Sequence, residues 1–443
     1  MSLQIIKSDT LLPEGWYSLS AQASGTQIIA VDESGIFYGI QSLLQLIRRN
    51  GERAELPETI IGGDFPDFRY RGMHLDVCRH FYPIDFIKKY IDLIAIHKMN
   101  YFHWHLTDDQ GWRIEIKKYP KLTEIGGFRK GTMVGKYSDQ NYDNIKSGGY
   151  YTQKEIKEIV AYAAERHITV IPEIENARAR NGRSCCIHPN LSCTGGPFEV
   201  AKGWGVFDDV FCTKEETFEF FYSVLDEVAE LFPGKYIHIG GDECPKTRWK
   251  GCKNCQSRIK EEGLKDEHEL QSWVVQKIER YLNSKGKRII GWDEILEGGL
   301  APNATVMSWR GTEGGIEAAN QNHDVIMTPG SHCYFDHYQG KPENEPLAIG
   351  GFTDLKKVYS FNPVPESLPA DKRKYILGAQ ANMWTEYILS EKQVEYMVLP
   401  RMTALSQVLW TGNKKGNYKS FAKSLPVFLN MLGKMGYNYR KLD

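Results

Sequence analysis

Gly72-Met-His-Leu-Asp-Val-Cys78, an apolar segment over residues 83–99 and Tyr101-Phe-His-Trp-His-Leu-Thr107 form the stretch that decides the fold. The two outer segments are short and rich in apolar and aromatic residues, and such runs predict buried strands. Between Phe86 and Ala95 the apolar side chains recur at the spacing of one helix face, which is typical of a helix packed on a sheet. The stretch therefore predicts a strand–helix–strand unit.

The same alternation continues through the rest of the chain. Eight strands are predicted, over residues 72–78, 101–107, 168–174, 236–240, 288–293, 305–309, 324–328 and 376–382. Helices are predicted between most of them, over residues 83–99, 152–167, 214–232, 267–285 and 314–322. This pattern predicts an α/β protein with a (β/α)8 TIM barrel. A doubly wound open sheet is the alternative, but no Gly-x-Gly-x-x-Gly follows the first strand.

The first sixty residues differ from the barrel pattern. Residues 27–32 predict a strand, residues 33–36 a turn and residues 38–49 a helix. So few elements cannot enclose a core of their own. We therefore expect residues 1–62 to form a partial α/β domain that rests on the barrel, and residues 63–443 to form the barrel with C-terminal helices.

Composition excludes several classes of partner. The chain has 443 residues with 55 Lys and Arg against 56 Asp and Glu, a formal charge of −1. Without a basic excess, a nucleic-acid partner is not expected. The sequence contains no run of eighteen apolar residues, so no membrane span is predicted. The N-terminus does not have the pattern of a secretory signal. A periplasmic or secreted protein whose signal is absent is expected, with a cytoplasmic one as the alternative. The oligomeric state is not predicted.

Nine cysteines give no clear metal pattern. Cys252 and Cys255 form a Cys-x-x-Cys, but a structural zinc needs four ligands and no second close pair follows. No metal site is predicted. Cys193 and Cys212, which bracket a glycine-containing loop, are expected to pair only in an oxidising compartment.

Acids and tryptophans follow the predicted strands at their carboxyl ends, where barrel active sites lie. The acids include Asp76, Asp108, Asp109, Glu173, Glu175, Asp242 and Glu243, and the tryptophans are Trp292, Trp309 and Trp384. Any single tryptophan has packing as its alternative role. Together, aromatic faces that pack on sugar rings and carboxylates that supply acid–base catalysis predict a carbohydrate site.

Asp242 and Glu243 stand side by side after the buried strand Tyr236-Ile-His-Ile-Gly-Gly. Two carboxylates in a partly desolvated pocket resist joint ionisation, which raises one pKa toward the value that a general acid needs. Neighbouring residues cannot straddle a glycosidic bond in the usual two-carboxylate way. Another nucleophile is therefore required.

Several ordered motifs resemble the β-N-acetylhexosaminidases of glycoside hydrolase family 20. The motifs are Arg71-Gly-Met-His-Leu-Asp, His103-Trp-His-Leu-Thr-Asp-Asp-Gln-Gly-Trp-Arg, His238-Ile-Gly-Gly-Asp-Glu, Gly291-Trp-Asp-Glu, Met307-Ser-Trp-Arg-Gly, Tyr334-Phe-Asp and Trp384-Thr-Glu. The resemblance extends from about residue 36 to residue 410. It implies a retaining exo-glycosidase that removes terminal non-reducing β-linked N-acetylglucosamine or N-acetylgalactosamine from glycans.

The resemblance also implies a role for each matching residue. Glu243 would be the general acid, Asp242 would orient the acetamido group of the substrate and Tyr334 would hydrogen-bond its carbonyl oxygen, which attacks the anomeric carbon to form an oxazolinium intermediate. The residues implied in sugar binding are Arg79, Trp292, Trp309, Asp336, Trp384 and Glu386. Asp108, together with a histidine after strand three, and His238 would support the site. No metal or organic cofactor is implied.

Residues 176–188 depart from the family pattern, which has Met-Pro-Gly-His after strand three. The segment is basic and contains Cys185-Cys186. Deleting one base from one permitted back-translation restores Glu-Met-Pro-Gly-His, so a frame-shifted segment is one hypothesis and a natural variant loop is the other. Without that histidine, Glu243 and Asp108 would lose a partner, so we expect impaired turnover. The alternative is a weak or inactive sugar-binding protein on the same barrel.

Overall fold

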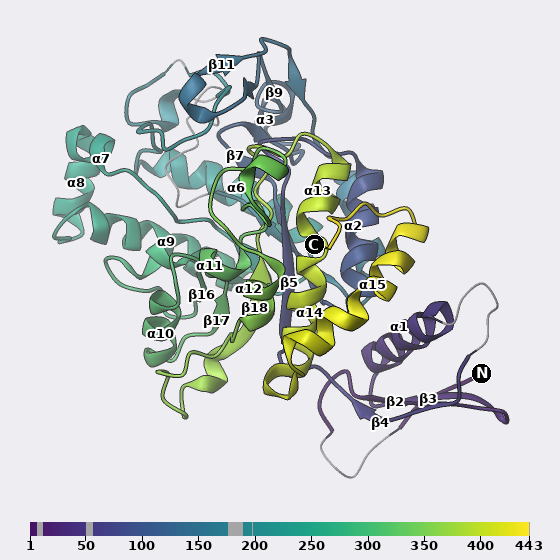
Figure 1. Ribbon diagram of the computed structural model, residues 1–443. Coiled ribbons are helices and arrows are strands. Elements are labelled where there is room, and N and C mark those ends of the chain that lie inside the picture. Colours follow the sequence, from purple (N-terminus) through teal and green to yellow (C-terminus); the bar gives the residue numbers. More distant parts are fainter. Residues whose placement is uncertain (7–11, 50–55, 176–188, 197, 443) are drawn as a thin grey trace.

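The computed structural model describes residues 1–6, 12–49, 56–175, 189–196 and 198–442. It consists of a large barrel with its surrounding helices and a small N-terminal sheet beside it (Figure 1). No helix among the described residues combines the length and the apolar character that a bilayer crossing requires.

Eight parallel strands close into a barrel in the order β13-β14-β15-β16-β17-β18-β5-β6. They are β5 (Tyr70–Asp76), β6 (Tyr101–His105), β13 (Thr169–Glu173), β14 (Tyr236–His238), β15 (Arg288–Trp292), β16 (Thr305–Ser308), β17 (Val325–Met327) and β18 (Ile376–Ala381). Each predicted strand is present, and the barrel is confirmed. Every residue of β5 is buried, because a parallel barrel strand is covered by helices outside and by side chains inside.

Helices surround the barrel and bury its outer face. Those that follow the predicted segments are α2 (Ile84–Ile96), α4 (Gln153–Ala164), α6 (Glu215–Leu231), α9 (Glu267–Ser284) and α10 (Glu313–Asn320). The C-terminal part adds α11 (Gly330–Cys333), α12 (Leu355–Ser360), α13 (Glu391–Val398), α14 (Arg401–Thr411) and α15 (Tyr418–Lys434). The start of α4 is fixed by a capping box, in which Thr152 and Glu155 each bind the other's backbone N–H.

Two of the long segments over the rim of the barrel, those after β6 and β14, contain short helices or strands. The first follows β6 and contains β7 (Thr107–Asp108), β8 (Gly111–Trp112), α3 (Lys121–Glu124), β9 (Phe128–Arg129), β10 (Met133–Val134), β11 (Asn141–Tyr142) and β12 (Ser147–Gly148). The second follows β14 and contains α7 (Thr247–Gly251) and α8 (Lys253–Glu261). Both rise from the carboxyl ends of strands, where they can shape a site.

The N-terminal unit is a four-stranded sheet with one helix. Its strands are β1 (Ser2–Ile5), β2 (Tyr17–Gln22), β3 (Gly25–Ala30) and β4 (Thr59–Asp64), in the order β1-β3-β2-β4, and its helix is α1 (Glu33–Arg49). The expectation of so few elements, without a core of their own, is therefore wrong. The predicted turn over residues 33–36 is also wrong, because α1 begins at Glu33.

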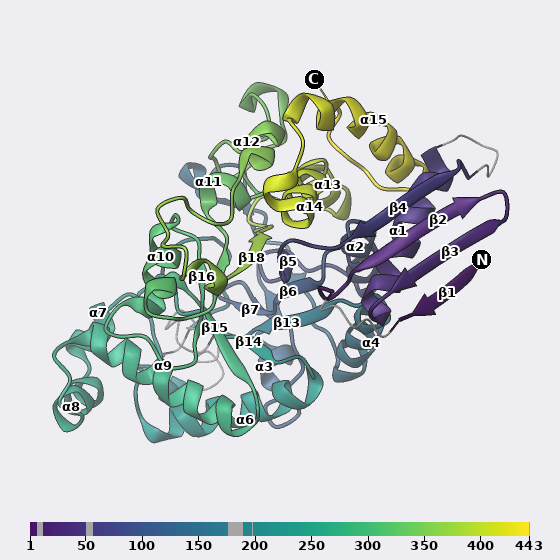
Figure 2. The ribbon, with the colours of Figure 1, turned by 90° about the horizontal axis from the view of Figure 1, so that it is seen from below.

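Helix α1 lies between this sheet and the C-terminal helices, as the two views show (Figures 1 and 2). Trp410 of α14 completes the core of the small unit: its ring meets Tyr38 edge-on at 5.1 Å, and its Nε1 donates to Asp64 Oδ1 at 2.7 Å. The unit thus has a core of its own, into which Trp410 packs.

Candidate active site

A pocket of about 340 Å³ opens at the carboxyl ends of the barrel strands. It is lined by Arg79, Asp242, Glu243, Trp292, Trp309, Tyr334, Asp336, His337, Ile349, Gly350, Gly351, Trp384 and Glu386. All nine residues implied in catalysis and sugar binding therefore meet in one cavity. The other two predicted site residues, Asp108 and His238, are buried and contact groups at its base.

The turn after β14 holds Asp242 and Glu243 in an unusual backbone conformation. Gly240 and Gly241 have φ angles of 68° and 97°, and Glu243, which is not a glycine, has a φ of 43°. A side chain at Gly240 would also collide with the carboxylate of Glu175. Such strained positions cluster at functional sites. The turn buries Asp242 to 7% exposure and leaves Glu243 exposed at the mouth.

Aromatic rings form the walls of the pocket. Trp292 and Trp384 lie with their ring centroids 5.8 Å apart at 45°. Opposite rings come from Trp309 and Tyr334, which stack at 6.2 Å. Such faces pack well on the C–H-rich faces of a sugar ring.

Arg79, Asp336 and Glu386 form a polar end of the pocket. Arg79 contacts Glu386 at 3.7 Å and lies over the Trp384 ring at 5.2 Å. Burial raises the pKa of Asp336 well above its usual value, and the nearby charge of Glu386 adds to this. Burial likewise raises the pKa of Glu386, against the opposing charge of Arg79. Among the described residues, Asp336 Oδ1 and Glu386 Oε2 are buried without a hydrogen-bond partner, so both oxygens are available to ligand hydroxyls.

Beneath the pocket, the buried Glu173 carboxylate connects several side chains. Its Oε1 accepts from Trp292 Nε1 at 2.8 Å and lies 3.0 Å from His238 Nδ1. Its Oε2 lies 3.1 Å from His103 Nε2 and contacts His105 Nδ1. Burial alone raises the pKa of Glu173, but the three histidines outweigh burial and the net pKa lies well below its usual value. Glu173 thus fixes the orientation of Trp292, one wall of the pocket.

Asp108 joins this network to the pocket. Its Oδ2 lies 2.7 Å from Arg79 and 3.1 Å from His105 Nε2. Burial lowers the pKa of His105, but the charge of Glu173 and the hydrogen bonds that His105 donates to Asp108 and Glu173 outweigh burial, so the net pKa lies well above its usual value. Asp108 thus has Arg79 and His105 as partners, and the loss of its histidine partner after strand three stays a prediction. The histidine expected after strand three falls within residues 176–188, outside the described part of the chain.

Glu294 contacts two residues that line the pocket, and its role was not predicted from the sequence. Its Oε2 accepts from Trp309 Nε1 at 2.9 Å, and its Oε1 accepts from the backbone N–H of Glu243 at 3.4 Å. Burial, with the charge of Asp242 next in size, raises the pKa of Glu294 to about 8. The available signal was the Trp292-Asp-Glu string at the end of the fifth strand.

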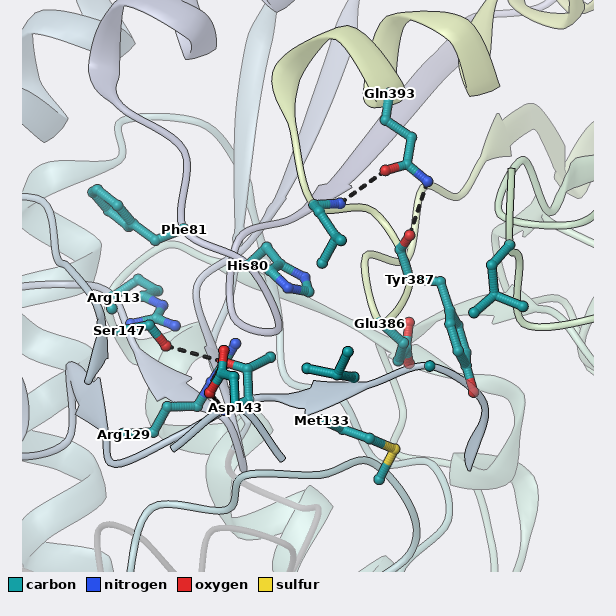
Figure 3. A pocket seen from close by; sticks show the side chains of 16 residues that line it. His80, Phe81, Arg113, Arg129, Met133, Asp143, Ser147, Glu386, Tyr387 and Gln393 are labelled. Carbon is teal, nitrogen blue, oxygen red and sulfur yellow. Dashed lines mark hydrogen bonds between the residues drawn. The ribbon is translucent and has the colours of Figure 1, made fainter. Parts of the chain in front are cut away.

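A second cavity of about 490 Å³ adjoins the pocket and shares Glu386 with it. Figure 3 shows Glu386 beside Tyr387, with His80, Arg129 and Met133 around the cavity. Gln393 accepts from Leu389 N at 3.0 Å and donates to the carbonyl of Tyr387 at 2.9 Å. These two bonds hold the segment that carries Glu386.

Four cysteines meet in a cluster that the sequence spacing did not indicate. Cys193 and Cys212 are both free thiols in the structure, and their pairing in an oxidising compartment stays a prediction. Their sulfurs lie beside those of Cys252 and Cys255, all within 4.8 Å of one another. The sequence offers no second close pair because Cys193 and Cys212, which are far apart in the chain, meet Cys252 and Cys255 only in the folded structure.

A parallel barrel whose strand ends present paired carboxylates and tryptophan walls defines the class of barrel glycosidases. The sequence model of glycosyl hydrolase family 20, catalytic domain, matches residues 68–413, and that of glycosyl hydrolase family 20, domain 2, matches residues 2–62. The chain belongs to glycosyl hydrolase family 20. The match over residues 2–62 agrees with the separate N-terminal unit.

Curated relatives and solved structures support the same family. A Beta-hexosaminidase of Porphyromonas gingivalis is 51% identical over 97% of this chain and 55% of its own length, and one of Vibrio furnissii is 39% identical over 91% and 66%. The chain thus spans about half the length of the first of these. The exo β-N-acetylglucosaminidase of Vibrio harveyi in complex with N-acetylglucosamine has a TM-score of 0.87 at 35% identity, covering 99% of this chain and 69% of that one. A β-N-acetylhexosaminidase of Bacteroides fragilis has a TM-score of 0.85 at 32% identity, covering 99% and 85%.

Proposed function

We propose that this chain is a retaining exo-β-N-acetylhexosaminidase that removes terminal β-linked N-acetylglucosamine or N-acetylgalactosamine from glycans. The observation that carries the proposal is the adjacent pair Asp242 and Glu243 at a pocket walled by tryptophans. Two neighbouring carboxylates cannot flank a glycosidic bond, whereas family 20 uses the substrate's own amide as nucleophile. The pair then needs only to steer that amide and to supply a proton.

The exposed position of Glu243 suits a proton donor to the leaving group. In the proposed first step the acetamido carbonyl oxygen attacks the anomeric carbon while Glu243 protonates the departing oxygen. Buried Asp242 accepts the amide N–H and stabilises the positive charge that develops on the oxazolinium, and Tyr334 donates to the carbonyl oxygen. Water then attacks the anomeric carbon and gives its proton to Glu243, which restores the acid.

The polar end of the pocket suits the hydroxyls of a terminal sugar. The unpartnered oxygens of Asp336 and Glu386 accept hydroxyl hydrogens, and Arg79 donates to hydroxyl oxygens. Three groups converging on one end of the sugar hold it in the reactive position. This end supports exo action, because a further sugar attached there would displace those contacts.

Two substrates with different leaving groups test the proposal. Purified chain should release N-acetylglucosamine from 4-nitrophenyl β-N-acetylglucosaminide and from N,N′-diacetylchitobiose, and it should leave 4-nitrophenyl β-glucoside intact. Glu243→Gln should reduce kcat/KM far more for chitobiose, because nitrophenolate departs without protonation. Equal losses on both substrates would remove Glu243 from the acid role. Turnover of the glucoside at a similar rate would exclude an acetamido nucleophile.

Residues 176–188 bear on the rate of this chain. We propose that the segment is frame-shifted and that turnover is impaired, since loss of a supporting contact costs roughly 10- to 100-fold. Restoring Met-Pro-Gly-His should raise kcat by that factor, and a close relative's gene should read Met-Pro-Gly-His without interruption. Unchanged rates would refute the impairment. Binding of N-acetylglucosamine without any turnover of either substrate would favour a sugar-binding protein.

A further inference from the structure

Four cysteine sulfurs from two separate parts of the chain converge beside the rim of the barrel. The Sγ atoms of Cys193 and Cys255 are 3.7 Å apart, those of Cys212 and Cys252 are 3.6 Å apart, and those of Cys212 and Cys255 are 3.8 Å apart. The remaining pairs lie within 4.8 Å. The four sulfurs therefore surround one common point.

These spacings match the coordination shell of zinc. Zinc binds thiolates at about 2.3 Å in tetrahedral geometry, which separates neighbouring sulfurs by about 3.8 Å. Four soft thiolate ligands in a tetrahedron select zinc or iron. We propose that Cys193, Cys212, Cys252 and Cys255 form a structural zinc site. This inference is independent of the proposed glycosidase activity.

The surroundings are those of a closed structural site. Cys212 and Cys255 are essentially inaccessible, and Cys252 is 8% exposed. The four lie in a small apolar cluster with Trp249 and Leu270. With four protein ligands and an apolar shell, no coordination position is left for a substrate, which distinguishes structural from catalytic zinc.

The local backbone favours thiolates. Helix α8 begins directly after Cys252 and contains Cys255 in its first turn, and the dipole at a helix N-terminus stabilises negative charge. The backbone of Thr213 also hydrogen-bonds the sulfur of Cys255. Bonds of this kind orient the ligands of metal sites.

The site would join two rim loops that bear on the pocket. Cys193 and Cys212 bracket the loop that carries Trp204, whose ring lies 6.3 Å from Tyr387, the neighbour of Glu386. Cys252 and Cys255 follow the turn that carries Glu243. The loops already meet through Trp249 Nε1, which donates to the carbonyl of Phe211 at 2.9 Å.

An ion pair between Arg248 and Asp209 at 2.9 Å makes a second contact between the same loops. Zinc would fasten this junction, because metal binding free energy adds directly to the stability of the fold that brings the ligands together. The metal would act on the position of the loops and not on the chemistry of hydrolysis.

Metal analysis of the full-length purified chain tests the proposal. We expect about one zinc per chain, released when a mercurial reacts with the thiols, and zinc X-ray absorption that fits four sulfurs at about 2.3 Å. Cys255→Ser and Cys212→Ser should each lose most of the zinc. Cys244→Ser is the matched control, since Cys244 packs in the same cluster but lies outside the four, and it should retain the metal.

If the serine variants do not fold, cobalt exchange into the unaltered chain gives a second measurement. Tetrahedral Co²⁺ with four thiolates has intense visible absorption that octahedral or oxygen-bound Co²⁺ does not have. Absence of zinc together with a mass four hydrogens lower would show two disulfides instead and overturn the proposal. Free alkylation of the four proposed ligand cysteines in the folded protein would also overturn it. A red, iron-containing protein would overturn it as well.

Discussion

Replacing Glu173 with glutamine should destabilise the barrel more than any comparable change at its surface. Glu173 is fully buried and contacts His103, His105 and His238. Removing one partner of a buried ion pair leaves an uncompensated charge and costs about 3–5 kcal/mol. Glutamine keeps an oxygen for Trp292 but turns an amide N–H₂ toward His105, so the loss should fall in that range.

The pH dependence of this loss follows from the two pKa shifts. The lowered pKa of Glu173 contributes stability that is present above the usual Glu value of about 4.3 and is lost as pH falls through the lower folded pKa. The raised pKa of His105 contributes stability that is present below the usual His value of about 6.5 and is lost as pH rises through the higher folded pKa. The difference between the two proteins should therefore be largest between about pH 4.5 and 6.5.

Urea unfolding at pH 5.5, followed by tryptophan fluorescence, measures the difference. Glu158→Gln is the matched control: it makes the same chemical change in an ion pair with Lys88 at 2.5 Å on the surface, and it should leave the urea midpoint unchanged. Equal midpoints for Glu173→Gln and the control would refute the role of Glu173 as the charged centre of the barrel interior.

Three further changes test other parts of the structure. Asp242→Asn should reduce kcat/KM for 4-nitrophenyl β-N-acetylglucosaminide by about 10²–10³-fold, because it removes the charge that stabilises the oxazolinium; a loss below tenfold would contradict that role. Burial and then the charge of Asp242 raise the pKa of Glu294 to about 8. The shift contributes stability that is present below the usual pKa of a glutamate and is lost as pH rises through about 8, so the urea midpoint of the unaltered chain should fall between pH 5 and 8. Glu294→Gln should remove this fall, and a variant whose urea midpoint falls as much would count against the shift. Trp410→Ala should cost about 3–5 kcal/mol and expose residues 1–62 to protease, whereas an unchanged cleavage rate would show that the N-terminal unit does not need this side chain.

The barrel was predictable because its strands carry their signal locally. Each of the eight strands is a short run of apolar and β-forming residues that ends in polar side chains, and every boundary lies within two residues of the prediction. The helices were equally clear, since one face of each buries apolar residues at helical spacing. The resemblance of the sequence motifs to family 20 also identified the nine pocket residues.

The N-terminal strands were missed for a physical reason. All residues of β1 are exposed, so no alternation of buried and exposed residues marks it. Strand β4 contains Gly62-Gly63, which in sequence resembles a turn. Both strands take their place through pairing with β3 and β2, which is a tertiary contact that local patterns do not encode.

The cysteine cluster and the Glu173 network depend on contacts between distant segments. Cys193 and Cys212 reach Cys252 and Cys255 only because the loops after β13 and β14 adjoin on the barrel. Glu173 meets His105 because the register of β13 on β6 places them opposite each other. A closed parallel barrel predicts that neighbouring strand ends meet, but it does not say which side chains point inward together.

The most direct test of the central claim varies the nucleophile within the substrate. Nitrophenyl glucosaminides that carry acetyl, fluoroacetyl, difluoroacetyl and trifluoroacetyl groups differ mainly in the electron density on the amide oxygen. If that oxygen attacks the anomeric carbon, kcat/KM should fall steeply and steadily through the series, by orders of magnitude in all. A flat series, with equal kcat/KM for all four substrates, would contradict the account.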